Sequence, residues 1–140
     1  MVFNRSYDLL GVCMAEKISF HTDKAAELGG PYSQAVIYKE MIYLSGQGAV
    51  DPSTNQLKTG TIENEATLAL ENIKHIMEAA GSSLDKVLQV SVYLSDIREY
   101  GRFNDVYRKY FRDPMPARTC VEVKRLPFGL RVEIDTVGYI

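Results

Sequence analysis

The chain has 140 residues, of which 46% are apolar and 24% charged, and its formal net charge is −2. This length and composition predict one soluble domain that buries its own core, with little room for a deep cleft inside a single chain. No apolar run approaches the roughly 20 residues that span a bilayer, so membrane insertion is not expected.

Residues 1–16 are expected to form a flexible N-terminal extension, and residues 17–140 a single domain. The first 14 residues contain no apolar core of signal-peptide length, which argues against secretion. We expect a cytoplasmic protein. A mitochondrial location, with residues 1–14 as a weak leader, is the alternative, and Met14 is an alternative start.

Three strand candidates occupy the first part of the domain. A short run at 18–21 precedes a turn at Gly29-Gly30-Pro31. Two β-prone runs, 35–38 and 41–44, flank Lys39-Glu40 and resemble a hairpin, although that pair lacks the usual glycine.

Residues 61–80 show the periodicity of an amphipathic helix that begins at Thr61 and ends before Gly81. Apolar side chains recur every three or four residues and form one stripe, and the opposite face is acidic and expected to be exposed. The predicted stripe consists of Ile62, Ala66, Ala69, Leu70, Ile73, Ile76, Met77 and Ala80.

A strand with one face on the core is predicted for residues 88–95, where apolar and polar residues alternate. A second helix should follow and end at Asp113-Pro114. Its predicted inner side consists of Tyr100, Phe103, Val106, Tyr107, Tyr110 and Phe111.

The last two strands alternate in the same way. Thr119, Val121 and Val123 share one face, and Leu130, Val132 and Ile134 share one face of the final strand. The opposite faces consist of Arg118, Cys120 and Glu122, and of Arg131, Glu133 and Asp135.

The predicted order is β-β-β-α-β-α-β-β, an α+β fold in which two helices cover one side of a single sheet. The uncovered face is expected to include Tyr93 and Cys120 beside charged residues. Such a face is too polar for a core and too mixed for bare solvent, so we expect it to meet other copies of the chain in a closed ring.

Basic residues concentrate between Arg98 and Arg131, where nine Lys or Arg stand against four acids. This local charge of +5 favours a small anionic ligand or, as a weaker alternative, nucleic acid, while a solvated helix face explains most such runs.

Several classes of chemistry are excluded by missing motifs. The chain has no nucleotide-binding P-loop, no GxSxG and no HExxH, and Gly46-Gln47-Gly48 lacks the context of a dinucleotide site. With only His21 and His75, and with Cys13 and Cys120 far apart, no metal cluster or catalytic triad is expected. We therefore expect no cofactor and no metal.

Arg118 is the strongest candidate for binding chemistry that the residues themselves offer. It enters a strand directly after Pro116-Ala117, so its guanidinium could clamp a carboxylate through two parallel hydrogen bonds. A cross-strand ion pair with Glu133 or Asp135 is the alternative, and spacing alone favours it.

Six blocks of sequence, in fixed order and spacing, stand out in the chain. They are Gly30-Pro31-Tyr32-Ser33-Gln34-Ala35, Leu44-Ser45-Gly46-Gln47, Phe103-Asn104-Asp105-Val106-Tyr107, Pro116-Ala117-Arg118-Thr119-Cys120-Val121-Glu122-Val123, Arg125-Leu126-Pro127 and Val132-Glu133-Ile134. Together these blocks closely resemble the RidA (YjgF) family of reactive-intermediate deaminases. The resemblance runs from about residue 18 to the C-terminus and leaves residues 1–16 outside it.

This resemblance implies a chorismate-mutase-like fold and a homotrimer in which the sheets line a central barrel and clefts lie between subunits. It also implies a 2-iminobutanoate/2-iminopropanoate deaminase. Such an enzyme hydrolyses enamines and imines, for example 2-aminoacrylate, to 2-oxo acids and ammonia without a metal or coenzyme.

The resemblance also implies roles for individual residues. Arg118 matches the carboxylate-binding arginine, Glu133 the acid near the attacking water, and Tyr32 the tyrosine of the cleft. Cys120 matches a cysteine that faces the ligand, and Asn104 a helix asparagine that braces the site. The loop that lines the pocket matches Ser45 and Gly46.

Each role has a structural alternative. Tyr32 would pack in an interface, Cys120 would be a small core residue, Asn104 an exposed polar residue of a helix, and Glu133 an ion-pair partner. The chain also departs from the family's usual form at Gly48-Ala49 and Phe128-Gly129, which alters the expected pocket shape and rim and leaves the substrate open.

Two other functions remain. A regulator that binds carboxylates or 2-oxo acids without turnover needs Arg118 but not Glu133. A translation inhibitor that acts on RNA would use the basic segment, although the chain has no histidine placed for such cleavage and no evident stacking platform for single strands.

Overall fold

The computed structural model describes residues 6–7, 13–14, 16–27 and 29–140. The predicted flexible extension, residues 1–16, lies for the most part outside these ranges. Within it, β1 (Ser6–Tyr7) pairs with β2 (Cys13–Met14) in an antiparallel ladder. No helix of the described ranges is long and apolar enough to cross a membrane.

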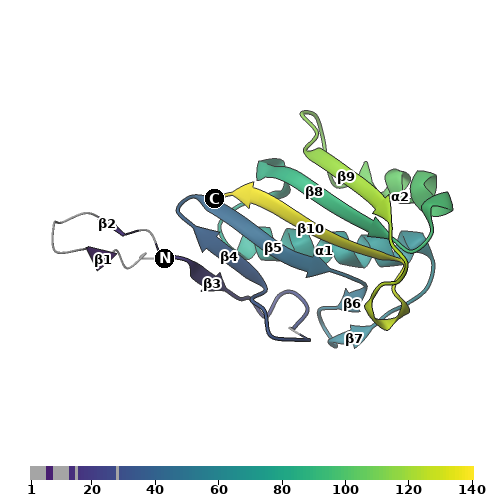
Figure 1. Ribbon diagram of the computed structural model, residues 1–140, viewed down its shortest axis with the longest axis horizontal. Coiled ribbons are helices and arrows are strands. Elements are labelled where there is room, and N and C mark those ends of the chain that lie inside the picture. Colours follow the sequence, from purple (N-terminus) through teal and green to yellow (C-terminus); the bar gives the residue numbers. More distant parts are fainter. Residues whose placement is uncertain (1–5, 8–12, 15, 28) are drawn as a thin grey trace.

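One six-stranded sheet forms the body of the domain, in the order β3-β4-β5-β10-β8-β9 (Figure 1). All neighbouring strands are antiparallel except β8 and β9, which are parallel. The strands are β3 (Ile18–Phe20), β4 (Ala35–Tyr38), β5 (Met41–Gln47), β8 (Val87–Leu94), β9 (Ala117–Glu122) and β10 (Val132–Tyr139). A separate pair is formed by β6 (Val50–Asp51) and β7 (Gln56–Leu57).

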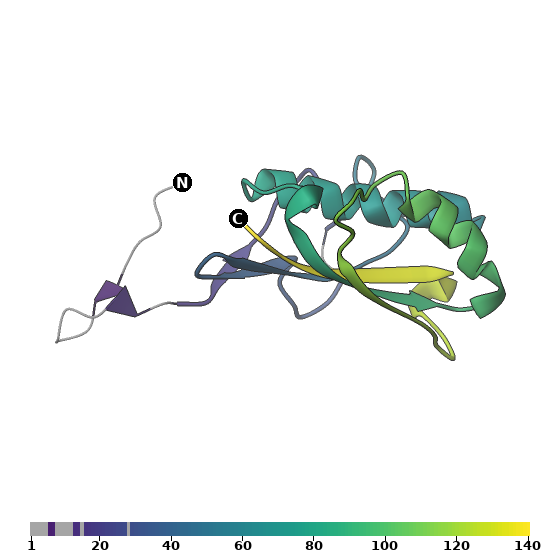
Figure 2. The same ribbon diagram turned by 90° about the horizontal axis from the view of Figure 1, so that it is seen from above.

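Two α-helices, α1 (Ile62–Ala79) and α2 (Tyr100–Tyr107), lie on one side of this sheet (Figure 2). Three short 3-10 turns, η1 (Leu84–Lys86), η2 (Ile97–Glu99) and η3 (Pro127–Gly129), connect the other elements. The predicted α+β order and the single mixed sheet with two helices on one face are confirmed.

The first helix follows its sequence pattern closely. The side chain of Thr61 accepts a hydrogen bond from the amide of Asn64 and caps the helix, and Gly81 follows it with φ +82°. All eight residues of the predicted apolar stripe are buried against the sheet. The helix therefore forms because one face can be removed from water.

The second helix is shorter than predicted, because it ends at Tyr107 rather than near Asp113. Tyr110 leaves the helical path and donates a hydrogen bond to Glu71 of α1 at 2.7 Å, and the ring of Phe111 packs on Tyr107 with 4.6 Å between centroids. These contacts redirect the chain after Tyr107, and Tyr110 is only half-buried. Tyr100, at the start of the helix, is exposed rather than part of the core.

The uncovered face of the sheet carries Tyr93, as predicted, but not Cys120. In the parallel pairing of β8 with β9, Cys120 lies beside Val92 and Val121 beside Tyr93. Val92 is buried under the helices and Cys120 packs against the same core, so the prediction for Cys120 is wrong. Alternation along β9 correctly predicts that Arg118 and Cys120 share one face. It does not predict which face the helices cover, because that depends on how β9 pairs with β8.

Glu65 is buried on the helix face that was predicted to be acidic and exposed. Its carboxylate accepts one hydrogen bond from the amide of Gly60 at 3.0 Å and one from the amide of Arg131 at 2.7 Å. Both amides lie outside the regular hydrogen bonding of helix and sheet. Glu65 therefore ties the start of α1 to the segment that leads into β10.

Glu65→Ala is expected to lower the free energy of unfolding by about 2–4 kcal/mol, because two amides at a buried position lose their charged acceptor. Urea unfolding at fixed chain concentration measures this loss. Glu63→Ala is the matched control, because Glu63 lies on the same turn but pairs with Arg102 in solvent. Its effect should be clearly smaller, and equal effects would contradict the role assigned to Glu65.

Candidate functional site

The predicted site residues fall into two separate groups. Tyr32, Ser45, Gly46 and Glu133 surround one hollow, which we call the Glu133 hollow. The other group, which we call the Arg118 cluster, consists of Arg118, Cys120, Asn104 and the aromatic residues of α2 that pack on Arg118, namely Tyr100, Phe103 and Tyr107.

The Glu133 hollow has a volume of about 520 Å³. Gly46 makes room for the acid, because a β-carbon at this position would lie 2.2 Å from Oε1 of Glu133. The hydroxyl of Ser45 donates to the carbonyl of Ser33 at 2.7 Å, and the hydroxyl of Tyr32 accepts from the amide of Gly29 at 3.3 Å. The loop before β4 is thereby held against the end of β5.

The Glu133 carboxyl is half-buried on β10 and points to the uncovered face, the side occupied by its cross-strand neighbour Tyr93. Burial raises the pKa of Glu133 above its usual value, and the negative charge of Asp135 adds to this rise. Asp135 itself accepts a hydrogen bond from the hydroxyl of Tyr93 at 3.1 Å. Glu133 is thus a carboxyl group whose proton affinity exceeds that of an ordinary surface glutamate.

In the Arg118 cluster, the guanidinium lies over an aromatic surface on the helix side of β9. Its carbon is 4.6 Å from the ring centroid of Tyr107 and 5.5 Å from that of Tyr100. One guanidinium nitrogen, Nη2, donates to the hydroxyl of Tyr100 at 3.1 Å. The rings fix the position of the guanidinium and leave most of its hydrogen-bond donors without an acceptor in the described ranges.

Arg118 forms no ion pair with any described carboxylate, whereas Arg98, Arg102, Arg108 and Arg131 all do. The alternative of a cross-strand pair with Glu133 or Asp135 is therefore wrong for this chain.

Further polar groups of α2 lie on the same side as Arg118. Asn104 shares the helix face of Tyr100 and Tyr107 through its spacing of four and three residues. Asn104 Oδ1 and the hydroxyl of Tyr107 are buried and have no hydrogen-bond partner among the described residues. Burial raises the pKa of Tyr107 to about 12, although the charge of Arg118 acts in the opposite direction. Both groups are neutral and keep unused hydrogen-bonding capacity.

Cys120 is half-buried behind Arg118 and packs against the core. Burial raises the pKa of its thiol, and the charge of Arg118 offsets only part of that rise. Because a thiolate is the reactive form of cysteine, this environment favours a packing or ligand-facing role over nucleophilic attack.

One chain does not bring the two groups together. Glu133 and Arg118 lie on β10 and β9, which are separated by β8 at roughly 4.8 Å per strand, and their side chains point to opposite faces of the sheet. Arg118 lies on an edge strand, where a second molecule can approach it. A single chain therefore leaves the two groups apart.

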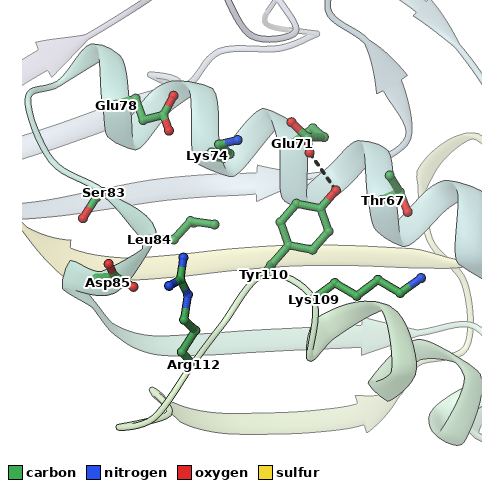
Figure 3. A pocket seen from close by; sticks show the side chains of 10 residues that line it. All are labelled: Thr67, Glu71, Lys74, Glu78, Ser83, Leu84, Asp85, Lys109, Tyr110 and Arg112. Carbon is green, nitrogen blue, oxygen red and sulfur yellow. Dashed lines mark hydrogen bonds between the residues drawn. The ribbon is translucent and has the colours of Figure 1, made fainter.

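A second hollow, of about 570 Å³, lies on the helix side and contains none of the predicted site residues. Figure 3 shows Tyr110 reaching Glu71 on α1 across this hollow. Its rim carries Lys74, Lys109 and Arg112 together with several carboxylates, so charges of both signs surround it. No cluster of three or more His, Cys, Asp or Glu side chains in the described ranges could hold a metal ion.

Two features of the site were missed by sequence reasoning. Helical spacing predicts Tyr100 and Tyr107 on the inner face of α2 as core residues, whereas the structure shows that both rings support the guanidinium of Arg118. Phe128 and Leu130 line the Glu133 hollow beside Pro127. The sequence signal for this wall is Phe128-Gly129, where the chain departs from the usual form of the family. That departure predicts a changed pocket rim but not an apolar wall.

Comparison with known proteins gives a consistent result. The family model described as Endoribonuclease L-PSP matches residues 22–140. A relative named 2-iminobutanoate/2-iminopropanoate deaminase, from Homo sapiens, is 43% identical over 117 residues, which cover 84% of this chain and 85% of the relative.

Solved structures agree with the fold. RidA from the Antarctic bacterium Psychrobacter sp. PAMC 21119 superposes with a TM-score of 0.84 at 41% identity, covering 88% of this chain and 99% of that one. E. coli TdcF with bound serine superposes with a TM-score of 0.79 at 34% identity, covering 86% and 96%. Sequence and fold agree across the described domain, and the chain belongs to the RidA (YjgF) family, whose sequence model bears the description Endoribonuclease L-PSP.

Proposed function

We propose that this protein hydrolyses reactive imines and enamines that carry a carboxylate, such as 2-aminoacrylate, and releases 2-oxo acids and ammonia. The observation that carries the proposal is Arg118, a guanidinium held by aromatic rings on an edge strand without a carboxylate partner in the described chain. Family membership supports the same chemistry, because imine deamination is the activity named for several relatives. The relative TdcF was crystallised with serine, which carries a carboxylate.

Arg118 would bind the substrate carboxylate through paired, charge-assisted hydrogen bonds. The electrophilic imine carbon is bonded directly to this carboxylate carbon, so anchoring the anion also fixes where the reacting atom lies. Asn104 and the hydroxyl of Tyr107 are the nearby buried groups that still lack a partner among the described residues. They would orient the bound molecule rather than react with it.

Glu133 would act on the attacking water. It accepts a proton as the water oxygen bonds to the imine carbon and passes this proton to the substrate nitrogen, which gives the neutral carbinolamine. In the second step Glu133 takes the proton of the carbinolamine hydroxyl and delivers it to the amino nitrogen, so that the carbon–nitrogen bond breaks, ammonia leaves and the 2-oxo acid forms. Imines hydrolyse readily in water, so a modest acceleration is sufficient and no strong base is required.

A complete site requires a second copy of the chain in this proposal. The Arg118 cluster of one subunit would face the Glu133 hollow of its neighbour, and the half-polar uncovered sheet face would line the centre of a homotrimer. Three chains of 15.8 kDa give a particle of about 47 kDa. Light scattering checks this mass, and a monomer would contradict the shared site.

In the decisive experiment, the imines are generated in situ by an amino-acid oxidase, or by a dehydratase that releases 2-aminoacrylate. The rate of 2-oxo acid and ammonia formation is followed with and without the protein. We expect faster release with the protein present. Equal rates across imines of several amino acids would eliminate the catalytic proposal.

A regulator that binds carboxylates without turnover is the second candidate. It is favoured by the Arg118 cluster, because that cluster offers an arginine and unpartnered polar groups without any need for Glu133. Binding of a 2-oxo acid combined with no acceleration of imine hydrolysis would select this function.

We do not extend the proposal to RNA. Four of the nine basic residues between Arg98 and Arg131 are neutralised by ion pairs with carboxylates, so the positive charge of the segment is partly compensated. Steep salt dependence of RNA binding would be required to revive that alternative.

A further inference from the structure

We propose that Phe128 and Leu130 form an apolar chamber beside Glu133 that selects imines with a large apolar side chain. This inference rests on the proposed function and specifies its substrate class. It is carried by the backbone conformation of Phe128, by the missing side chain at Gly48 and by the size of the Glu133 hollow.

Phe128 occupies a position that an aromatic residue does not favour. Its φ is 59°, in the left-handed region. The residue is 76% exposed, the highest value among the exposed large apolar residues of the described ranges. Gly129 follows with φ 71°. A residue with a branched β-carbon or a large ring is strained there, whereas glycine or asparagine is not.

Neither burial nor the turn itself explains this residue. The exposed ring contributes little to the core, and the turn could be made at lower cost by asparagine. Strained residues that persist without a folding benefit occur mainly at functional sites. Phe128 is one of the residues that line the Glu133 hollow, so a ligand bound in that hollow could cover its ring.

The floor of the chamber is made apolar by Gly48. A β-carbon at Gly48 would lie 2.6 Å from Cδ1 of Leu130, so the absence of a side chain lets Leu130 lie over the backbone at this point. Val50 and Pro127 line the same hollow. An apolar wall and floor therefore adjoin the carboxyl group of Glu133.

The size of the hollow also exceeds what the smallest imines need. Its volume of about 520 Å³ falls within the range of pockets that enclose drug-sized ligands, about 300–1,000 Å³. An imine derived from alanine has only a methyl group to offer this wall. Imines derived from leucine or phenylalanine carry a side chain that would remove the exposed ring of Phe128 from water.

The test compares kcat/KM for imines generated by an amino-acid oxidase from L-phenylalanine and from L-alanine, using the full chain. We expect the ratio of the two values, phenylalanine over alanine, to fall about tenfold in Phe128→Ala, mainly through a higher KM for the larger imine. Phe128→Tyr keeps the ring and should keep the ratio. Ile97→Ala removes an exposed apolar side chain elsewhere and should also keep it.

Phe128→Asn separates strain from contact. It should raise Tm by a few degrees, because asparagine tolerates the left-handed conformation, while it lowers the selectivity ratio as Phe128→Ala does. An unchanged ratio in both variants overturns the inference and leaves the deaminase proposal intact. If Phe128→Ala alters the mass in light scattering but not the ratio, the ring packs against another copy and the inference is also overturned. Failure of the unsubstituted protein to accelerate either reaction refutes the deaminase proposal itself, and the inference with it.

Discussion

Arg118→Ala is expected to lower kcat/KM for imine hydrolysis by at least about 100-fold, because the substrate loses the group that fixes its carboxylate and hence its reacting carbon. Arg118→Lys should restore only part of this loss. Lysine supplies a charge but not the planar fork that binds two carboxylate oxygens, nor the flat surface that stacks on the Tyr107 ring. Initial rates of 2-oxo acid formation at several substrate concentrations measure both variants.

The control for this prediction is Arg98→Ala. Arg98 is an arginine of the same basic segment, but it is exposed and paired with Asp96. Its loss removes the same charge without touching the Arg118 cluster, so kcat/KM should change little. If Arg98→Ala and Arg118→Ala have equal effects, the overall charge of the segment would account for catalysis and Arg118 would have no special place in it.

A mixed-chain experiment tests whether Arg118 and Glu133 act across two subunits. Chains with Arg118→Ala and chains with Glu133→Gln should each be inactive alone. If each site takes Arg118 from one subunit and Glu133 from its neighbour, one site in four retains both residues after unfolding and refolding in equal amounts. The mixture should then recover about a quarter of the original activity. No recovery from a correctly sized oligomer would place both residues in one chain's site.

Glu133→Gln is expected to lower kcat by about 100-fold or more, because the water loses the group that accepts its proton. The unsubstituted protein should also lose activity as pH falls, since only the ionised carboxylate accepts a proton. Burial and Asp135 raise the pKa of Glu133, so the midpoint of this loss should lie above the usual value of 4.5 for glutamate. The rate without protein is subtracted at each pH, because imines themselves titrate.

The sign of the Asp135 effect provides an independent check on Glu133. Asp135→Asn removes a negative charge near Glu133, so the ionised form of Glu133 becomes easier to reach and the midpoint should move to lower pH. A midpoint that stays in place in Asp135→Asn would assign the acidic limb to another group. Glu133→Gln should lose this limb altogether.

The order and type of the main elements were predictable because they depend on local periodicity. The apolar stripe of α1 and the alternation in β8 and β10 each follow from a repeat of the chain's own geometry. The end of α2 was not predictable in this way, because Tyr110 leaves the helix to reach Glu71, which lies 39 residues earlier. The burial of Glu65 depends likewise on the distant amide of Arg131.

The candidate site likewise has a part that the sequence predicts and a part that only the tertiary structure decides. Motif resemblance selected Arg118, Glu133 and their neighbours without any knowledge of their positions in space. Only the tertiary structure placed Arg118 over the rings of α2 and Glu133 on the other face of the sheet, because side-chain direction on β9 depends on its parallel pairing with β8. Alternation specifies which residues share a face, whereas the layer covering that face is decided by packing between segments far apart in the chain.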